Sequence, residues 1–296
     1  MTTALSGSYT ALVTPFTEDA AAIDWPAFER LVALQLQGGT HGLVPAGTTG
    51  ESPTLSMDEH KEIISRTVKL ANGKAVVLAG TGSNNTAEAI ELTRHAETAG
   101  ADAALIITPY YNKPTQEGIF QHFKALHAAT NLPLMLYDVP GRTVARLSDE
   151  LVKRLQNELP RIVGLKDATA DLARPLALSL IFGNGFRLFS GEDATVLPFY
   201  VQGGHGCISV TSNVAPSLCA ALYTNYTAGN LAEAQRINRL LLPLSNALFF
   251  ETSPAPVKYA LSKLGLCSNT LRLPLVPITA ATAAAVDKAL EHAGLL

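Results

Sequence analysis

Cysteine is scarce in this chain, with 3 in 296 residues. Cys207, Cys219 and Cys267 are odd in number, lie far apart and form no CxxC pair. This spacing argues against a disulfide framework and against a zinc ribbon, and it fits a reducing compartment. We therefore expect three free thiols.

Signals for nucleic-acid or membrane partners are also absent. The formal net charge of −3 leaves no basic stripe, which excludes nucleic acid as an expected partner. No run of about 18 apolar residues occurs, so we expect no membrane span. Residues 1–16 lack a basic segment followed by an apolar run, so we expect no secretory signal and a cytoplasmic location.

Common catalytic and cofactor motifs are missing as well. The seven histidines show no HxH or HExxH spacing, and no serine stands in a GxSxG elbow. No GxGxxG follows the first apolar run and no GxxxxGK[ST] occurs anywhere. We expect neither a metal site nor a bound cofactor, and an esterase triad is unsupported.

Apolar residues are abundant, at 47% of the chain against 16% charged, so a large core can form. Eight short runs rich in Val, Ile and Leu are apolar on both faces, as parallel strands covered on both sides are. We expect these strands at Tyr9–Val13, Gly42–Pro45, Ala75–Ala79, Ala103–Thr108, Leu134–Tyr137, Ile162–Lys166, Phe186–Phe189 and Gly206–Val210.

Segments of helical period alternate with these runs. They include Asp24–Gln37, Asp58–Ala71, Thr86–Ala99 and Gln116–Ala129, and Asp24, Ser56 and Ser148 are candidate N-caps. Eight such repeats predict an α/β fold, a (β/α)8 TIM barrel over residues 1–225. A doubly wound open sheet is the alternative, but its glycine-rich fingerprint is absent.

Three further helical patterns follow the eighth run, at Asn230–Phe250, Pro254–Leu264 and Ala280–His292. No low-complexity linker separates them from the preceding residues. We expect residues 226–296 to form additional C-terminal helices packed on the barrel, not an independent domain.

Lys166 is the most informative residue at a predicted strand end. It closes the apolar run that begins at Ile162, whereas most other lysines lie in polar surroundings. Active sites of such barrels lie at the carboxyl ends of the strands, and burial there favours the neutral amine that attacks a carbonyl. Pattern alone leaves a second interpretation open, in which Lys166 pairs with Asp167 or another carboxylate at the rim.

Neighbouring strand ends carry side chains that suit such an amine. Tyr137 closes the preceding strand and, with Thr48, could relay protons. The turn Gly47–Gly50 could bind a carboxylate through converging N–H groups, although Gly-Thr turns are common. Arg142 follows a tight turn and could bind a second carboxylate, or form a surface salt bridge.

Long motifs in a fixed order resemble the dihydrodipicolinate synthase (4-hydroxy-tetrahydrodipicolinate synthase) family of pyruvate-dependent class I aldolases, a superfamily that includes N-acetylneuraminate lyase. The similarity runs over nearly the whole chain. Its motifs are GTTGES at 47–52, AGTGSN at 79–84, TPYYNKPTQEG at 108–118, YDVPGRT at 137–143, GLKDAT at 164–169, SGED at 190–193 and GGHGCISVTSN at 203–213.

The resemblance implies a lyase of lysine and diaminopimelate biosynthesis that joins pyruvate to L-aspartate 4-semialdehyde. Lys166 would form a Schiff base with pyruvate. A proton relay would consist of Thr48, Tyr137 and Tyr111, the last lent by a partner subunit in a homotetramer built as a dimer of dimers. Substrates would be bound by Thr49 for the pyruvate carboxylate, Arg142 for the semialdehyde carboxylate, and Gly191 and Ile208 as pocket lining.

Two departures from the family pattern flank the site, Asp138 where Asn is frequent and Asp167 where Glu is frequent. Family members inhibited by L-lysine bind it at positions matching Ser52, Pro53, Met57, His60, Asn84, Glu88 and Tyr110. Met57 stands where sensitive enzymes often have histidine, which leaves inhibition open.

Two alternatives in function remain. A sugar-acid lyase of the same superfamily would share the Lys, Tyr and Gly-Thr core, but Arg142 and the Tyr110-Tyr111 pair favour the synthase. A catalytically silent barrel would be expected to have lost Lys166, Tyr137 or Thr48, and all three are present.

Overall fold

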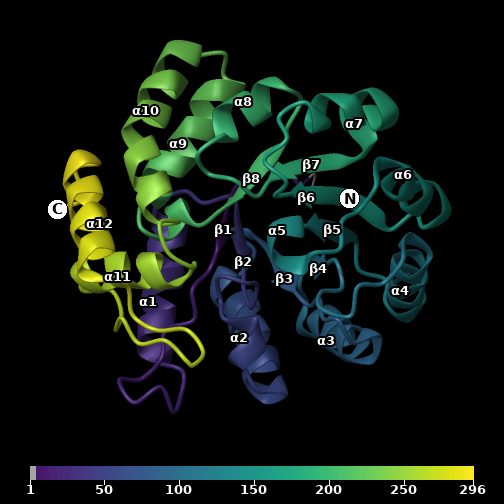
Figure 1. Cartoon of the computed structure of the whole chain (residues 1–296), viewed down its shortest axis with the longest axis horizontal. Coiled ribbons are helices and arrows are strands. Elements are labelled where there is room, and N and C mark those ends of the chain that lie inside the picture. Colours follow the sequence, from purple (N-terminus) through teal and green to yellow (C-terminus); the bar gives the residue numbers. More distant parts are fainter. Residues whose placement is uncertain (1–4) are drawn as a thin grey trace.

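A computed structural model describes residues 5–296 and shows eight parallel strands closed into a barrel (Figure 1). Each strand pairs with the next in the sequence, and β8 pairs with β1. The strands are β1 (Gly7–Ala11), β2 (Gly42–Val44), β3 (Val76–Gly80), β4 (Ala103–Ile107), β5 (Leu134–Asp138), β6 (Ile162–Asp167), β7 (Arg187–Ser190) and β8 (Gly206–Ser209). The predicted (β/α)8 barrel is confirmed.

The first strand is displaced from its predicted position. It starts at Gly7 instead of Tyr9, because Gly7 and Ser8 pair with β8 and the barrel pairing overrides their turn propensity. It ends before Val13, whose N–H donates to the side-chain oxygen of Asn213 at 3.2 Å. The other strands differ from prediction by a single residue at one or both ends.

Helices surround the barrel (Figure 1). They are α1 (Trp25–Gln37), α2 (Met57–Ala71), α3 (Thr86–Ala99), α4 (Gln116–Ala129), the short α5 (Pro140–Thr143), α6 (Asp149–Glu158), α7 (Arg174–Phe182), α8 (Val196–Val201) and α9 (Pro216–Thr227). The side chains of Asp24, Ser56 and Ser148 accept backbone N–H bonds at helix starts, as predicted. Within residues 5–296, no helix has the length and apolar character needed to cross a membrane.

Three C-terminal helices, α10 (Leu231–Ala247), α11 (Ala255–Lys263) and α12 (Ala280–His292), lie together on one side of the barrel (Figure 1). α10 packs against α9, and α12 packs against α10 and α11. Leu244 and Val257 are fully buried in the same core as the barrel helices. We propose that residues 226–296 are an extension of the barrel of residues 1–225, because their apolar faces join one continuous core.

The interior of the barrel is filled with side chains. Tyr9, Met135, Phe189 and Ile208 form a packed cluster inside it, and Tyr9 meets Phe189 edge to face at 4.9 Å. A barrel of eight strands is just wide enough for such filling. Within residues 5–296 the interior is therefore filled, which favours a ligand site at the strand ends.

Candidate active site

A cavity of about 200 Å³ lies at the carboxyl ends of the strands, where this architecture places active sites. Strands β1 to β6 all contribute to its wall. The predicted residues that line it are Thr48, Thr49, Ser52, Pro53, Tyr110, Tyr137, Arg142 and Lys166. Residues far apart in the sequence are thus brought to one cavity.

Lys166 lies in β6 with 7% of its surface exposed, and its side-chain nitrogen is 4.2 Å from the centroid of the Tyr137 ring. The β5–β6 register places these two residues side by side. Asp167 faces Arg174 instead of Lys166, and no carboxylate of residues 5–296 forms an ion pair with the lysine. Of the two interpretations, the structure favours a lysine beside a phenol over a lysine paired with a carboxylate.

The turn Gly47–Gly50 follows β2 and presents Thr48 and Thr49 to the cavity. Backbone bonds of 3.1 Å close it, from the N–H of Gly50 to the carbonyl of Gly47 and from that of Glu51 to the carbonyl of Thr48. Gly80 of β3 packs so closely that a side-chain carbon there would lie 2.7 Å from the carbonyl oxygen of Ala46. The backbone at the start of the turn therefore packs directly against β3, with no room for a side chain at Gly80.

Behind the turn lies a fully buried ion pair. The ammonium of Lys258, from α11, contacts the carboxylate of Glu51 at 2.7 Å, and both side chains have no exposed surface. The other oxygen of Glu51 accepts the backbone N–H of Arg272 at 3.1 Å. No local pattern in the sequence identifies this pair, because 207 positions separate its partners.

Arg142 stands in the short helix α5, directly after β5, and lines the cavity. Its guanidinium donates to the carbonyl of Ser253 at 3.3 Å, and it forms no ion pair within residues 5–296. The surface salt bridge that was the alternative is thus not present there. The guanidinium is left with donors for an anion.

Glu192, which follows β7, is a carboxylate that interacts electrostatically with Lys166 and Arg142. Burial raises its pKa and Asp193 adds to this rise, whereas Lys166 and Arg142 lower it. A side-chain carbon at Gly191 would lie 3.2 Å from Cε of Lys166. This segment therefore lies against the lysine and adds a carboxylate near both cations.

Three of the predicted catalytic and substrate-binding residues do not line the cavity. Tyr111 is 88% exposed and has a left-handed backbone, with φ of +68°. Ile208 is buried in the barrel interior, and Gly191 lies behind the lysine. Within one chain, Tyr111 is therefore separate from the Tyr137–Lys166 pair.

The positions suggested for lysine regulation divide into two groups. Ser52, Pro53 and Tyr110 line the cavity. Three of the others make bonds within the chain: His60 bonds the carbonyl of Gly80 at 2.7 Å, Glu88 accepts from Ser83 at 2.9 Å, and the carbonyl of Asn84 accepts from Asn112 at 2.9 Å. Burial lowers the pKa of His60, which favours its neutral form.

Arg174 was also missed, although the sequence carries a signal for it. It stands at the first position of α7, before Pro175, where the helix dipole disfavours a cation. A buried cation at such a place requires specific carboxylate partners. Asp138 and Asp167, the two departures noted above, are among them.

Comparisons with known proteins agree with this geometry. The model of the Dihydrodipicolinate synthetase family matches residues 4–293. A curated relative, the 4-hydroxy-tetrahydrodipicolinate synthase of Bradyrhizobium diazoefficiens, is 53% identical over 294 residues, covering 99% of this chain and 98% of its own.

Two solved structures extend the comparison. The chloride-inhibited dihydrodipicolinate synthase of Acinetobacter baumannii, complexed with pyruvate, is 44% identical, with a TM-score of 0.95 and coverage of 98% and 99% of the two chains. The enzyme of Cyanidioschyzon merolae with lysine bound is 39% identical, with a TM-score of 0.95 and coverage of 98% and 99%.

Proposed function

The chain belongs to the dihydrodipicolinate synthetase family, and we propose that it condenses pyruvate with L-aspartate 4-semialdehyde. This is the 4-hydroxy-tetrahydrodipicolinate synthase reaction of lysine and diaminopimelate biosynthesis, carried out by a lyase. The observation that carries the proposal is the amine of Lys166, buried beside Tyr137 and unpaired with any carboxylate of residues 5–296.

The neutral amine of Lys166 attacks the ketone carbon of pyruvate and forms a carbinolamine, which loses water to give the iminium. Loss of a proton from the pyruvate methyl group gives an enamine, whose carbon attacks the aldehyde carbon of the second substrate and regenerates the iminium. The amino group of the second substrate then attacks the iminium carbon, which closes the ring and releases the amine of Lys166. Tyr137 and Thr48 are placed at the cavity to move the protons of these steps.

The carboxylates of the two substrates find separate partners at the cavity wall. Thr49 and the turn around it bind the carboxylate of pyruvate, through the hydroxyl and backbone N–H groups. Arg142 binds that of the semialdehyde, since a guanidinium pairs with carboxylate in a bidentate way. No cofactor is required for these steps. Gly191 lies against the side chain of Lys166, and Ile208 belongs to the buried cluster that contains Tyr137.

A homotetramer, built as a dimer of dimers in the cytoplasm, completes the proposal. The exposed ring of Tyr111 is available to enter the site of a second copy and join its relay. A further interface is supported by the exposed apolar side chains Leu176, Leu180 and Ile181 of α7. L-Lysine is proposed as an inhibitor bound near Ser52 and Tyr110, as a relative with lysine bound suggests.

Reduction by borohydride tests the reaction. In the presence of pyruvate, borohydride should add a reduced pyruvyl group to Lys166, seen by mass spectrometry of peptides, and Lys166→Arg should show none. Absence of the adduct from the unaltered protein would refute the mechanism. A coupled assay should then show turnover with aspartate semialdehyde; turnover with N-acetylmannosamine in its place would identify a sugar-acid lyase instead.

Mixing subunits tests the shared tyrosine. Tyr111→Phe and Lys166→Ala subunits should each be nearly inactive alone, because each lacks part of the relay or the nucleophile. Mixed dimers should regain activity, since one of their sites has both groups intact. Mixed dimers verified by mass spectrometry that remain inactive would indicate a site contained in a single chain.

A further inference from the structure

Directly behind the Tyr137–Lys166 pair lies a second pair of side chains. Successive residues of a strand point to opposite faces, so Asp138 and Asp167 point away from the cavity that Tyr137 and Lys166 line. The β5–β6 register places the two aspartates side by side. Both are buried, with 0% and 4% of their surfaces exposed.

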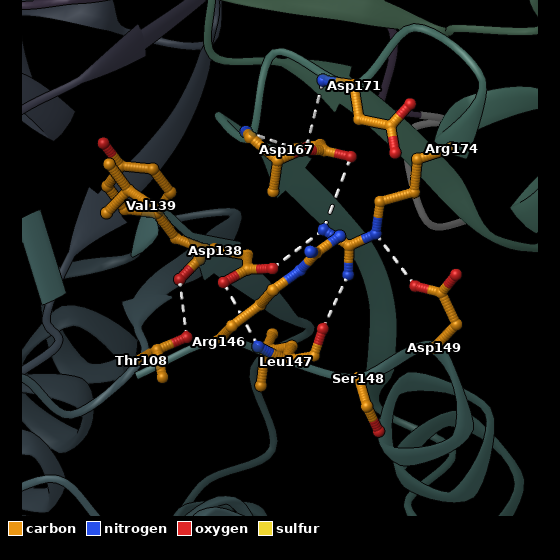
Figure 2. Close-up of polar contacts among 12 residues, drawn as sticks. Thr108, Asp138, Val139, Arg146, Leu147, Ser148, Asp149, Asp167, Asp171 and Arg174 are labelled. Atoms are coloured by element: carbon orange, nitrogen blue, oxygen red, sulfur yellow. Dashed lines mark hydrogen bonds and ion pairs between the residues drawn. The ribbon is translucent and has the colours of Figure 1, made fainter. Parts of the chain in front are cut away.

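Arg174 of α7 faces these aspartates, as Figure 2 shows. One terminal nitrogen of its guanidinium lies 2.8 Å from Asp138 and 3.5 Å from Asp167. Its Nε lies 2.8 Å from Asp149 at the start of α6. The other terminal nitrogen donates to the carbonyl of Leu147 at 2.9 Å, so every nitrogen of the guanidinium is used.

The contacts of Arg174 reach two functional parts of the chain. Through Asp138 and Asp167 it holds the ends of β5 and β6, which carry Tyr137 and Lys166. Through Leu147 and Asp149 it holds the far end of the segment that follows β5 and contains Arg142. The N–H of Leu147 also donates to Asp138 at 3.2 Å, which closes the network (Figure 2).

Burying these charges costs free energy, which is unfavourable for a contact that only stabilises the fold. Three carboxylates surround one guanidinium, and two of them are buried, so negative charge is in excess. Apolar side chains of similar volume could fill such a space at no loss of stability. Apolar groups have no direction, however, whereas a planar guanidinium fixes each partner at one angle.

We propose that Arg174 is a positioning residue that couples the two substrate subsites: it holds the amine of Lys166 against Tyr137 and also holds the segment that presents Arg142. This inference rests on the proposed function, because the subsites are those of pyruvate and the semialdehyde. It adds that one residue outside the cavity sets the geometry of both.

Two variants and one control test the coupling. Arg174→Lys keeps the positive charge but loses the planar guanidinium and its several fixed donors. It should slow formation of the borohydride-trapped imine on the order of 10- to 100-fold and also raise KM for aspartate semialdehyde. Asp149→Ala cuts only the contact toward α6. It should raise KM for the semialdehyde severalfold and leave the rate of imine trapping unchanged.

Glu150→Ala is the matched control, since Glu150 is an exposed acidic residue in the same first turn of α6. It should alter neither quantity. Urea unfolding of each variant shows whether a kinetic change comes from altered geometry or from a loss of folded protein. Should Arg174→Lys fail to fold, Asp149→Ala decides the question, because the side chain of Asp149 is 39% exposed.

The inference is overturned if Asp149→Ala and Glu150→Ala have the same KM for the semialdehyde, or if folded Arg174→Lys traps the imine at the unaltered rate. Failure of the proposed function would give a different result in the trapping experiment. In that case the unaltered protein itself gives no pyruvyl adduct, whatever Arg174 does.

Discussion

The two sides of the cavity are supported from behind by buried charges of different composition. Behind the turn after β2, one ammonium meets one carboxylate, Lys258 with Glu51. Behind β5 and β6, one guanidinium meets three carboxylates, those of Asp138, Asp149 and Asp167. The first cluster is balanced in charge, and the second is negative.

The two clusters differ because lysine and arginine side chains differ in shape. Lysine is a compact point charge, and Lys258 joins a C-terminal helix to a turn at a single contact. Arginine has a planar fork, and Arg174 joins two strand ends and a helix start at fixed angles. We expect the first cluster to matter most for stability and the second for geometry.

The largest effect is expected from Lys258→Met, which leaves Glu51 buried without a counter-charge. Breaking a buried pair in this way costs about 3–5 kcal/mol in the free energy of unfolding, measured by urea denaturation. The double variant Glu51→Gln/Lys258→Met should recover most of this loss, because no lone charge remains. Equal loss in the single and double variants would show that packing, not charge, holds the turn.

A smaller effect is expected when one carboxylate is neutralised on the other side. In Asp138→Asn the guanidinium keeps Asp149 and Asp167, so the loss should be only about 1 kcal/mol. The corresponding change Glu51→Gln leaves Lys258 with no carboxylate and should cost clearly more in the same urea experiment. Similar losses in the two variants would remove the distinction between the clusters.

The smallest effect concerns pH, where the clusters should differ in sign. Burial raises the pKa of Asp138 above its usual 3.8, although Arg174 opposes this. Asp138 therefore binds more proton in the native state than in the unfolded state just above pH 3.8, and its contribution to stability falls as pH rises through that window. Burial lowers the pKa of Lys258 below its usual 10.5, with Glu51 opposing, so the contribution of Lys258 to stability rises with pH through the window just below 10.5.

Unfolding measured across both windows checks these signs. The difference in stability between the unaltered protein and Asp138→Asn should fall as pH rises through the acidic window and stay constant through the alkaline window. Glu51→Gln should extend the alkaline slope to lower pH, because Lys258 then loses the charge that favours its protonated form. A difference that does not change across the acidic window would show that Asp138 contributes no such slope.

Most of the barrel could be predicted from local pattern. Continuous apolar runs such as Leu134–Tyr137 identify parallel strands, because both of their faces are covered. The predicted start of β1 was wrong by two residues. Gly7 and Ser8 favour a turn locally, and only the closure of the barrel pairs them with β8.

The candidate site could be predicted in part for the same reason. Apolar runs end at Tyr137 and Lys166, and another precedes Thr48. The ends of the strands in a barrel lie together at one rim, where these residues line the cavity. Arg174 could not be assigned, because its partners lie on three elements and depend on how α7 sits against β5 and β6. Its unfavourable place at a helix start was the only local signal.

The sequence by itself determined the order of strands and helices and the placing of an amine at the end of the sixth strand, because periodicity is written into neighbouring residues. Tertiary structure alone decided which charges lie behind that amine, that Lys258 is buried against Glu51, and that Tyr111 is exposed. Ion pairs between distant residues form only where packed helices remove water from both partners, and local sequence does not encode that contact.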